Sequence, residues 1–159
     1  MTIAADVLAK AKAYVDAKYK EGPNNDTVFG KWYGLNHQPW CAMFVSKCFA
    51  EAGVANLVAA SGKKGFAGCD AGYAWFAKKK QIVPVGQAQA GDIVFFNFDS
   101  NPHDTEHVGI VVSNDGKGNL VTYEGNTVGN NAGSQSNGDG VYKKKRQYKY
   151  VMGVARPKW

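Results

Sequence analysis

The sequence lacks a long apolar stretch. None of its apolar runs approaches the roughly 20 residues that a membrane-spanning helix needs, and we expect no membrane association. The first residues, 1–6, lack the basic and apolar segments of a secretory signal, so we expect none in this chain. Residues 1–159 contain no internal repeat, and their number suits one domain with a full hydrophobic core.

Cysteine is scarce, and the number of cysteines is odd: Cys41, Cys48 and Cys69. On one helix, Cys41 and Cys48 would lie two turns apart, on the order of 10 Å, which is too far for a disulfide. We therefore interpret Cys41 as a free thiol. Cys48 and Cys69 either pair or are buried, inert thiols, and the second interpretation is favoured.

Acidic residues are fewer than basic ones, and the formal net charge is +6. Much of the excess lies in two runs, residues 78–80 and 143–146. A basic surface favours polyanions such as nucleic acid, anionic lipid or cell-wall polymers, but such runs are equally well explained as solvated faces. No nucleic-acid-binding motif of defined spacing accompanies the charge, so we expect no nucleic-acid partner.

Apolar periodicity predicts helices before strands. Residues 3–20, capped by Thr2, and residues 41–52 have helical spacing, whereas residues 24–40 have the composition of a loop. A short helix is predicted over 70–80. The expected strands are 92–98, 107–113, 119–124, 141–148 and 150–155. This order indicates an α+β fold in which N-terminal helices pack on a small antiparallel β-sheet.

Cys41 has the position of a catalytic nucleophile. It follows Pro39-Trp40 and opens an apolar run, so it is expected in the first turn of its helix. The free N–H groups and positive partial charge of a helix N-terminus stabilise a thiolate. The same N–H groups could receive the oxyanion of a tetrahedral intermediate. Cys48, by contrast, lies in the middle of the predicted helix and is interpreted as a core residue.

A predicted hairpin brings a histidine to a carboxylate or an amide. Two strands flank the turn signal Asp115-Gly116. A two-residue turn places His107 opposite Glu124, and a four-residue loop places it opposite Asn126. Both registers put these three residues on one face of the hairpin. A distant thiol together with such a pair is the layout of a thiol-dependent hydrolase.

Four blocks in this order resemble the CHAP family, the cysteine- and histidine-dependent amidohydrolase/peptidase domains of bacterial and phage lysins. The blocks are Gln38–Val45, Ala90–Phe96, His107–Val111 and Tyr123–Thr127. The resemblance implies a papain-like fold and a single catalytic domain over residues 1–159. It also implies that Cys41 is the nucleophile and His107 the base. Glu124 matches the residue that orients the histidine, and Asn126 matches a fourth polar group that holds the histidine or polarises the site.

The resemblance also implies a substrate, bacterial peptidoglycan, and lytic, antimicrobial activity of the endolysin type. Some members cut between N-acetylmuramic acid and L-alanine, and others cut within the stem peptide or cross-bridge; the sequence leaves both open. Gln38 is expected to assist the oxyanion, and the candidates to line a substrate groove are Trp32, Tyr33 and Trp40. We expect a monomer. The lack of a signal fits a phage lysin released from the host cytoplasm, with a secreted autolysin or an injected effector as alternatives.

Two segments of the sequence have residues of the kind that bind metals. Some family members bind calcium just before the cysteine, but residues 24–27 here carry one carboxylate, Asp26, so we expect no cofactor and leave calcium open. His37 and Cys41, with His103 and His107, have zinc-like spacing, which would make a zinc-dependent hydrolase. That spacing suits a helix, whereas the segment around His103 has the composition of a loop. A non-catalytic, basic cell-wall-binding module is the other alternative.

Overall fold

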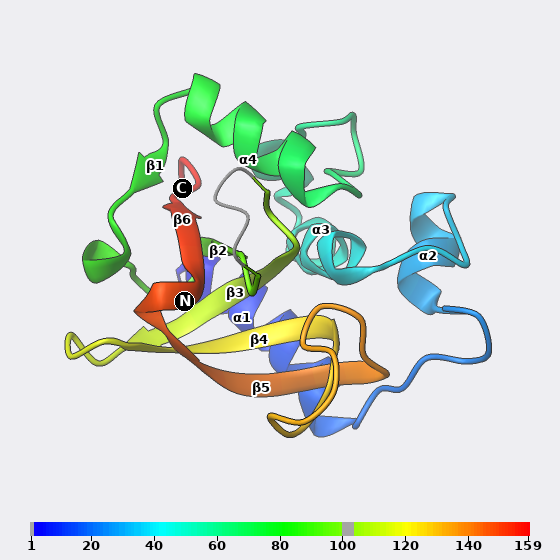
Figure 1. The fold of residues 1–159 in the computed structure, drawn as a ribbon. Coiled ribbons are helices and arrows are strands. Elements are labelled where there is room, and N and C mark those ends of the chain that lie inside the picture. Colours follow the sequence, from blue (N-terminus) through cyan, green and yellow to red (C-terminus); the bar gives the residue numbers. More distant parts are fainter. Residues whose placement is uncertain (1, 100–103) are drawn as a thin grey trace.

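The computed structural model describes residues 2–99 and 104–159 (Figure 1). The described chain contains four α-helices: α1 (Ile3–Asp16), α2 (Val28–Tyr33), α3 (Cys41–Glu51) and α4 (Cys69–Lys78). Short 3-10 helices cover η1 (Ala55–Val58), η2 (Val85–Gln87) and η3 (Tyr148–Tyr150). The strands are β1 (Ile82–Val83), β2 (Ile93–Phe96), β3 (His107–Asn114), β4 (Asn119–Thr127), β5 (Gly140–Gln147) and β6 (Val151–Ala155).

The six strands form one antiparallel sheet in the order β1-β6-β2-β3-β4-β5. Helix α3 packs against the central strands β3 and β4, α1 packs against α3 and β5, and α4 packs against β6 (Figure 1). The predicted α+β class, with N-terminal helices on a small antiparallel sheet, is confirmed. No helix in the described residues is long and apolar enough to cross a membrane.

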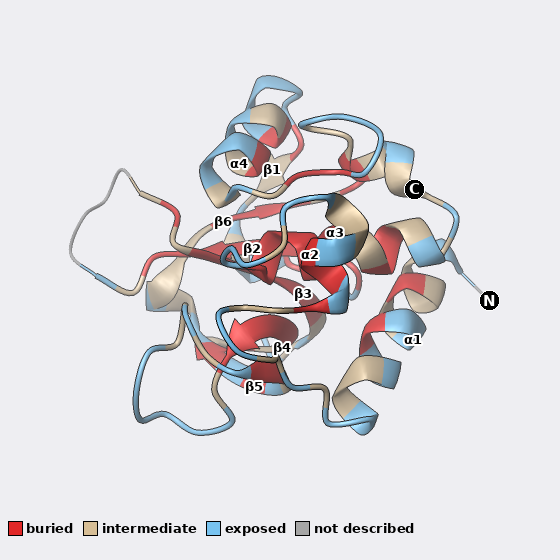
Figure 2. Ribbon diagram, turned by 90° about the vertical axis from the view of Figure 1, so that its right-hand side faces the viewer, coloured by how far each residue is buried: buried red, intermediate tan, exposed pale blue. Residues whose placement is uncertain are grey.

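Strand β2 shows how the sheet is covered on both faces. Ile93 and Phe95 belong to the core under the helices, whereas Val94 and Phe96 belong to a smaller cluster on the opposite face. This alternation follows from the two-residue repeat of a strand. All four residues of β2 are buried, and buried residues also run through the neighbouring strands (Figure 2).

Helix α2 lies in a segment that we expected to be a loop. The hydroxyl of Thr27 accepts a hydrogen bond from the backbone N–H of Gly30 at 2.9 Å and caps its first turn. Gly34 ends it in the left-handed conformation, with φ of 96°. The helix is too short to produce a helical repeat, so periodicity missed it. Helix α1 begins at the predicted cap, where Ala5 N–H donates to Thr2, but it ends at Asp16 instead of residue 20.

Strands β3 and β4 form the predicted hairpin. At the end that carries His107, their pairing has the register predicted for a four-residue loop. Ile110 pairs with Tyr123 and Val111 with Thr122, and a bulge follows towards the turn. Gly109 is required here because a Cβ at this position would lie 2.7 Å from Cγ of Glu124. The missing side chain therefore makes room for the carboxylate.

Candidate active site

Cys41 is the first residue of α3, as predicted. Trp40 precedes it as the helix N-cap, and the N–H of Phe44 closes the first turn on the Trp40 carbonyl at 2.9 Å. The backbone N–H of Ala42 hydrogen bonds to the Cys41 sulfur and favours its thiolate. The side chain of Cys41 is buried except for a 5 % exposed edge. The sulfur therefore lies at the positive end of a helix with limited contact with water.

Trp40 anchors this helix start and does not line a groove, which corrects our prediction. Its side chain is fully buried. The ring stacks on Phe29 with centroids 5.3 Å apart, and the indole N–H donates to the carboxylate of Glu21 at 3.1 Å. Gly125 of β4 packs directly against the same ring, since a Cβ there would lie 2.8 Å from a Trp40 ring carbon and 2.7 Å from Cβ of Phe44. The sheet and α3 thus touch beside the nucleophile.

His107 begins β3 and is fully buried. Its backbone pairs with Phe96 of β2, and its ring packs against the rings of Phe96 and Phe98 at 5.9 Å each. Nε2 of the imidazole lies 2.8 Å from Oε1 of Glu124. The predicted histidine–carboxylate pair is therefore present, and its contact fixes which ring nitrogen faces away from Glu124.

The second ring nitrogen of His107, Nδ1, is buried and has no hydrogen bond of regular geometry with any described residue. Cys41 nevertheless interacts with this ring. A hydrogen bond from Cys69 lowers the pKa of the Cys41 thiol, burial opposes this, and hydrogen bonding and charge from His107 lower it further. Burial alone would lower the pKa of His107, but Cys41 and Glu124 raise it to about 9. The two shifts favour a thiolate beside an imidazolium at neutral pH.

Glu124 is held by an arginine that the sequence analysis did not single out. Arg146 of β5 donates from Nε to Oε2 at 2.9 Å and from Nη2 to Oε1 at 2.6 Å. Thr122 donates to Oε2 at 2.5 Å. Burial alone would raise the pKa of Glu124, but Arg146 and His107 outweigh burial and lower it to about 2. The carboxylate is therefore charged, buried and oriented by three side chains.

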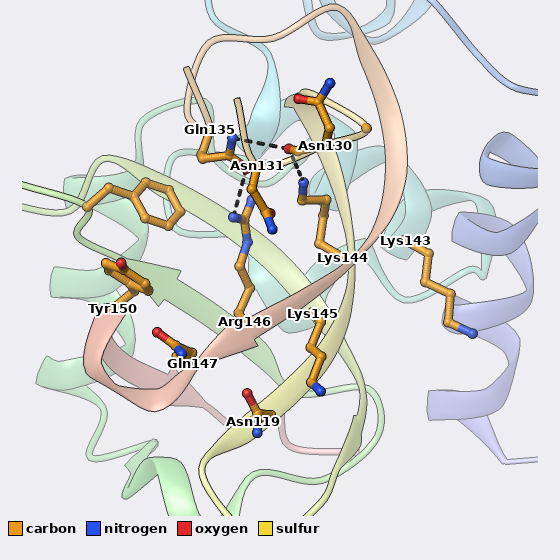
Figure 3. Close-up of a pocket in the computed structure, with 12 residues that line it drawn as sticks. Asn119, Asn130, Asn131, Gln135, Lys143, Lys144, Lys145, Arg146, Gln147 and Tyr150 are labelled. Carbon is orange, nitrogen blue, oxygen red and sulfur yellow. Dashed lines mark hydrogen bonds between the residues drawn. The ribbon is translucent and has the colours of Figure 1, made fainter. Parts of the chain in front are cut away.

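Strand β5 explains why Arg146 was missed. We had treated residues 143–146 as one basic run, but the strand turns alternate side chains to opposite faces. Lys144 and Arg146 are buried, whereas Lys143 and Lys145 are exposed. Arg146 also donates to Gln135, and Lys144 donates to the carbonyl of Asn130 (Figure 3). Lys144 donates to the carbonyl of Val128 as well. The two-residue repeat of the predicted strand could have indicated that one alternate pair of these basic residues is buried.

Cys69, expected to pair with Cys48 or to be a buried, inert thiol, is neither paired nor fully buried, and sequence reasoning missed its contact with Cys41. It begins α4, and its sulfur lies 3.7 Å from that of Cys41. All three cysteines are free thiols; Cys48 is buried in the core, as predicted. The hydrogen bond to Cys41 and burial raise the pKa of Cys69 well above its ordinary value, so Cys69 donates its proton towards the Cys41 thiolate.

Asn126 lies next to the site but does not hold the histidine. Its side chain is fully buried, and neither its oxygen nor its nitrogen has a hydrogen-bond partner in the described part of the chain. Its backbone is left-handed, with φ of 56°, at the point where the pairing of β4 and β5 shifts register. The strand alternation that we used to align it with His107 is interrupted here.

A cleft of about 440 Å³ opens onto the two sulfurs of Cys41 and Cys69. Gln38, Pro39, Asp70 and Thr105 are among the residues that line it. Asp70 accepts hydrogen bonds from the backbone N–H and the hydroxyl of Thr105, which ties the start of α4 to the segment before His107. Gln38 is exposed, and its expected role at the oxyanion stays a prediction.

Trp32 and Tyr33, the other candidates for substrate contact, are half-buried on α2 and are not among the residues that line this cleft. The amino groups of Lys47 and Lys64 lie over the ring of Trp32 at 5.5 and 5.6 Å. Tyr33 packs against the main core, and burial raises the pKa of its hydroxyl. Their role in substrate binding stays a prediction.

A larger hollow, of about 720 Å³, lies beside β5 and not at the sulfurs (Figure 3). The basic residues of β5 line it, namely Lys143, Lys144, Lys145 and Arg146. The two inward cations already bond to carbonyl, amide or carboxylate oxygens of the protein. Both buried cations that line this hollow are thus already paired within the protein.

Neither metal site considered from the sequence is assembled by the described residues. His37 is exposed and bonds through Nδ1 to the carbonyl of Asn24. His103 lies outside the described residues. In the segment proposed for calcium, the one carboxylate, Asp26, already bonds to Asn36 and Lys31. These contacts do not test calcium binding by this segment, which stays an expectation.

The fold and this site define a class: an α+β protein with a buried cysteine, histidine and glutamate in series, which is the arrangement of a cysteine-dependent hydrolase. The sequence matches the CHAP domain over residues 32–126, a segment that includes Cys41, His107, Glu124 and Asn126. The chain belongs to the CHAP domain family. A search of the curated proteins found no match.

Family membership sets the general chemistry. CHAP domains are amidohydrolases and peptidases of peptidoglycan, so this chain is a hydrolase of that general type. The expected papain-like α+β architecture agrees with the helices and the six-stranded sheet. Arg146 lies beyond the matched segment and is a feature of this chain's own structure.

Proposed function

We propose that this protein cleaves an amide bond of bacterial peptidoglycan through a covalent thioester on Cys41. The observation that carries the proposal is the buried series of Cys41, His107 and Glu124 beside an open cleft. The low pKa of Cys41 supplies the attacking thiolate, and the raised pKa of His107 supplies a proton donor at neutral pH.

In the proposed reaction, the Cys41 thiolate attacks the carbonyl carbon of the scissile amide. The N–H groups at the start of α3, with the exposed amide of Gln38, stabilise the negative charge on the carbonyl oxygen. The His107 imidazolium gives its proton to the leaving amine as the C–N bond breaks. Water then attacks the thioester, His107 accepts its proton, and the thiolate and a free carboxylate are released.

Glu124 acts through His107 in this proposal. It accepts from Nε2, keeps Nδ1 directed away from itself and stabilises the charged ring. Arg146 and Thr122 hold the carboxylate in place, which makes them positioning residues. For Asn126 we propose the other role that the resemblance allows: polarising the site, without a hydrogen bond to the histidine.

Cys41→Ala tests the proposal. It removes the nucleophile, so lysis of purified walls should fall by about 10⁴-fold or more, while sedimentation with intact walls is retained. Cys48→Ala is the matched control, because the same change in the core leaves the site intact. Iodoacetamide should inactivate the parent enzyme, whereas a chelator should not. Lysis by Cys41→Ala with a native circular dichroism spectrum would refute the proposal.

Digestion of peptidoglycan by the parent protein also identifies which amide bond is cleaved. Peptidoglycan of known composition is treated with the parent protein, and the fragments are analysed by mass spectrometry. Sugar-free peptides with a new L-alanine amino terminus identify an N-acetylmuramoyl-L-alanine amidase. Any other new amino terminus identifies an endopeptidase of the stem peptide or cross-bridge.

A further inference from the structure

Two free thiols meet in the cleft, and the proposed hydrolysis uses only one of them. The sulfurs of Cys41 and Cys69 are 3.7 Å apart, and they come from the first residues of two different helices, α3 and α4. Both side chains line the cleft of about 440 Å³, so a small solute can reach them from solvent. The third thiol, Cys48, is fully buried in the core.

The two thiols differ in protonation state, as a pair consisting of an attacking and a resolving cysteine requires. The pKa of Cys41 is lowered by Cys69 and His107, so Cys41 is the sulfur that carries negative charge. The pKa of Cys69 is raised, so Cys69 keeps its proton. Thiolates react with peroxides far faster than thiols do, and reactive sensor cysteines commonly have a second cysteine beside them.

The geometry allows a bond between them after a small movement. A disulfide needs about 2.05 Å between sulfurs, so the present 3.7 Å must shorten by about 1.7 Å. Gly68, which precedes Cys69 as the cap of α4, has open space around the position of a Cβ. Cys69 itself is only partly buried. The space at Gly68 allows the backbone before Cys69 and the Cys69 side chain to adjust, while Asp70 stays bonded to Thr105.

We propose that Cys41 and Cys69 form a reversible disulfide when the protein meets a hydroperoxide, and that this disulfide protects the nucleophile from irreversible oxidation. Formation of the disulfide does not depend on the proposed function. Its effect on wall lysis does, because that effect requires Cys41 to be the nucleophile.

The reaction is balanced with hydrogen peroxide as the oxidant. The Cys41 thiolate attacks one peroxide oxygen, the O–O bond breaks, and Cys41 sulfenic acid and hydroxide form. The sulfur of Cys69 then attacks the sulfur of the sulfenic acid. The S–S bond forms, the S–O bond breaks, and the Cys69 proton leaves with the hydroxyl group as water. The two sulfurs are together oxidised by two electrons, and the peroxide is reduced by two.

The test treats the folded protein with hydrogen peroxide and measures its intact mass and its peptide map. We expect the parent protein to lose two hydrogen atoms and to yield a peptide pair joined through Cys41 and Cys69. Dithiothreitol should restore both the mass and the lysis of walls. In Cys69→Ser, which keeps a hydroxyl donor beside Cys41, the same treatment should add oxygen atoms to Cys41, and dithiothreitol should not restore lysis.

Cys48→Ala is the control and should form the disulfide as the parent does, since Cys48 is remote from solvent. The proposal is overturned if Cys41 of the parent gains oxygen while Cys69 stays open to alkylation, or if the crosslinked peptide contains Cys48. The mass measurement needs no enzymatic activity. A protein that forms the disulfide but never lyses walls would therefore contradict the proposed function and leave this inference standing.

Discussion

Glu124 is a fully buried carboxylate. It stays ionised because hydrogen bonds and neighbouring cations offset the cost of burying its charge. Arg146 and Thr122 donate to one oxygen, and Arg146 and His107 contact the other. An isolated buried carboxylate would take up a proton. In this protein the pKa is instead about 2, so Glu124 stays negative and keeps His107 positive at neutral pH.

The raised pKa of His107 predicts the alkaline limit of activity. The imidazolium is present below about pH 9 and is lost above it, so kcat/KM on a soluble peptidoglycan fragment should hold through neutral pH and fall as pH rises through about 9. The rate of Cys41 alkylation by iodoacetamide should already be high at neutral pH, because the thiolate is formed there. If activity instead increases as pH rises through the ordinary pKa of a thiol, Cys41 and His107 do not form an ion pair at neutral pH.

At the scale of single residues, the sequence identified what local patterns can identify. Cys41 was found from its place after Pro39-Trp40, and His107 with Glu124 from the hairpin that joins their strands. Cys69 was missed because it meets Cys41 only when α4 folds against the site, and no short-range pattern reports such a contact. The burial of Trp40 was missed because its partners, Phe29 and Glu21, lie on segments with no recognisable repeat.

At the scale of elements, β5 is part of the site although it carries none of the reacting atoms. Its inward face presents Arg146 to Glu124, and its outward face presents lysines to solvent. The strand was predicted, but we interpreted its charges by composition instead of by alternation. The same applies to β4, where the left-handed Asn126 interrupts the alternation, which a two-residue repeat cannot anticipate.

Two substitutions on β5 compare the role of its buried face with that of its exposed face. Arg146→Gln removes one of the two cations that contact the buried Glu124, so it should lower the free energy of unfolding by about 3 kcal/mol and reduce kcat more than it raises KM. Lys143→Gln removes the same charge from the exposed face and should change stability by less than about 0.5 kcal/mol. Urea unfolding and steady-state kinetics measure both. Equal effects of the two changes would mean that Arg146 acts only as surface charge.

At the scale of the whole molecule, the net charge is +6, and the internal ion pairs do not contribute to this excess. Arg146 with Glu124 and Arg156 with Asp92 each cancel internally. Lysines 78–80 at the end of α4 and Lys143 and Lys145 on β5 are exposed. The molecule therefore presents excess positive charge to any anionic surface that it approaches.

This charge predicts that lysis of whole walls depends on salt. The Debye length falls from about 10 Å at 0.1 M to about 3 Å at 1 M salt, so wall lysis should decrease over this range as approach to an anionic wall is screened. Cleavage of a small, uncharged peptidoglycan fragment should change little. The comparison is made by turbidity for walls and by chromatography for the fragment. Lysis of walls that is indifferent to salt would show that charge does not bring the domain to its substrate.

Gly125 gives the site one more property. Since a single methyl group there would collide with Phe44 and Trp40, strand β4 lies directly against α3. The strand that carries Glu124 and the helix that carries Cys41 therefore meet with no side chain between them. A residue larger than glycine at position 125 would push these two elements apart, and with them the thiol and the carboxylate that holds His107.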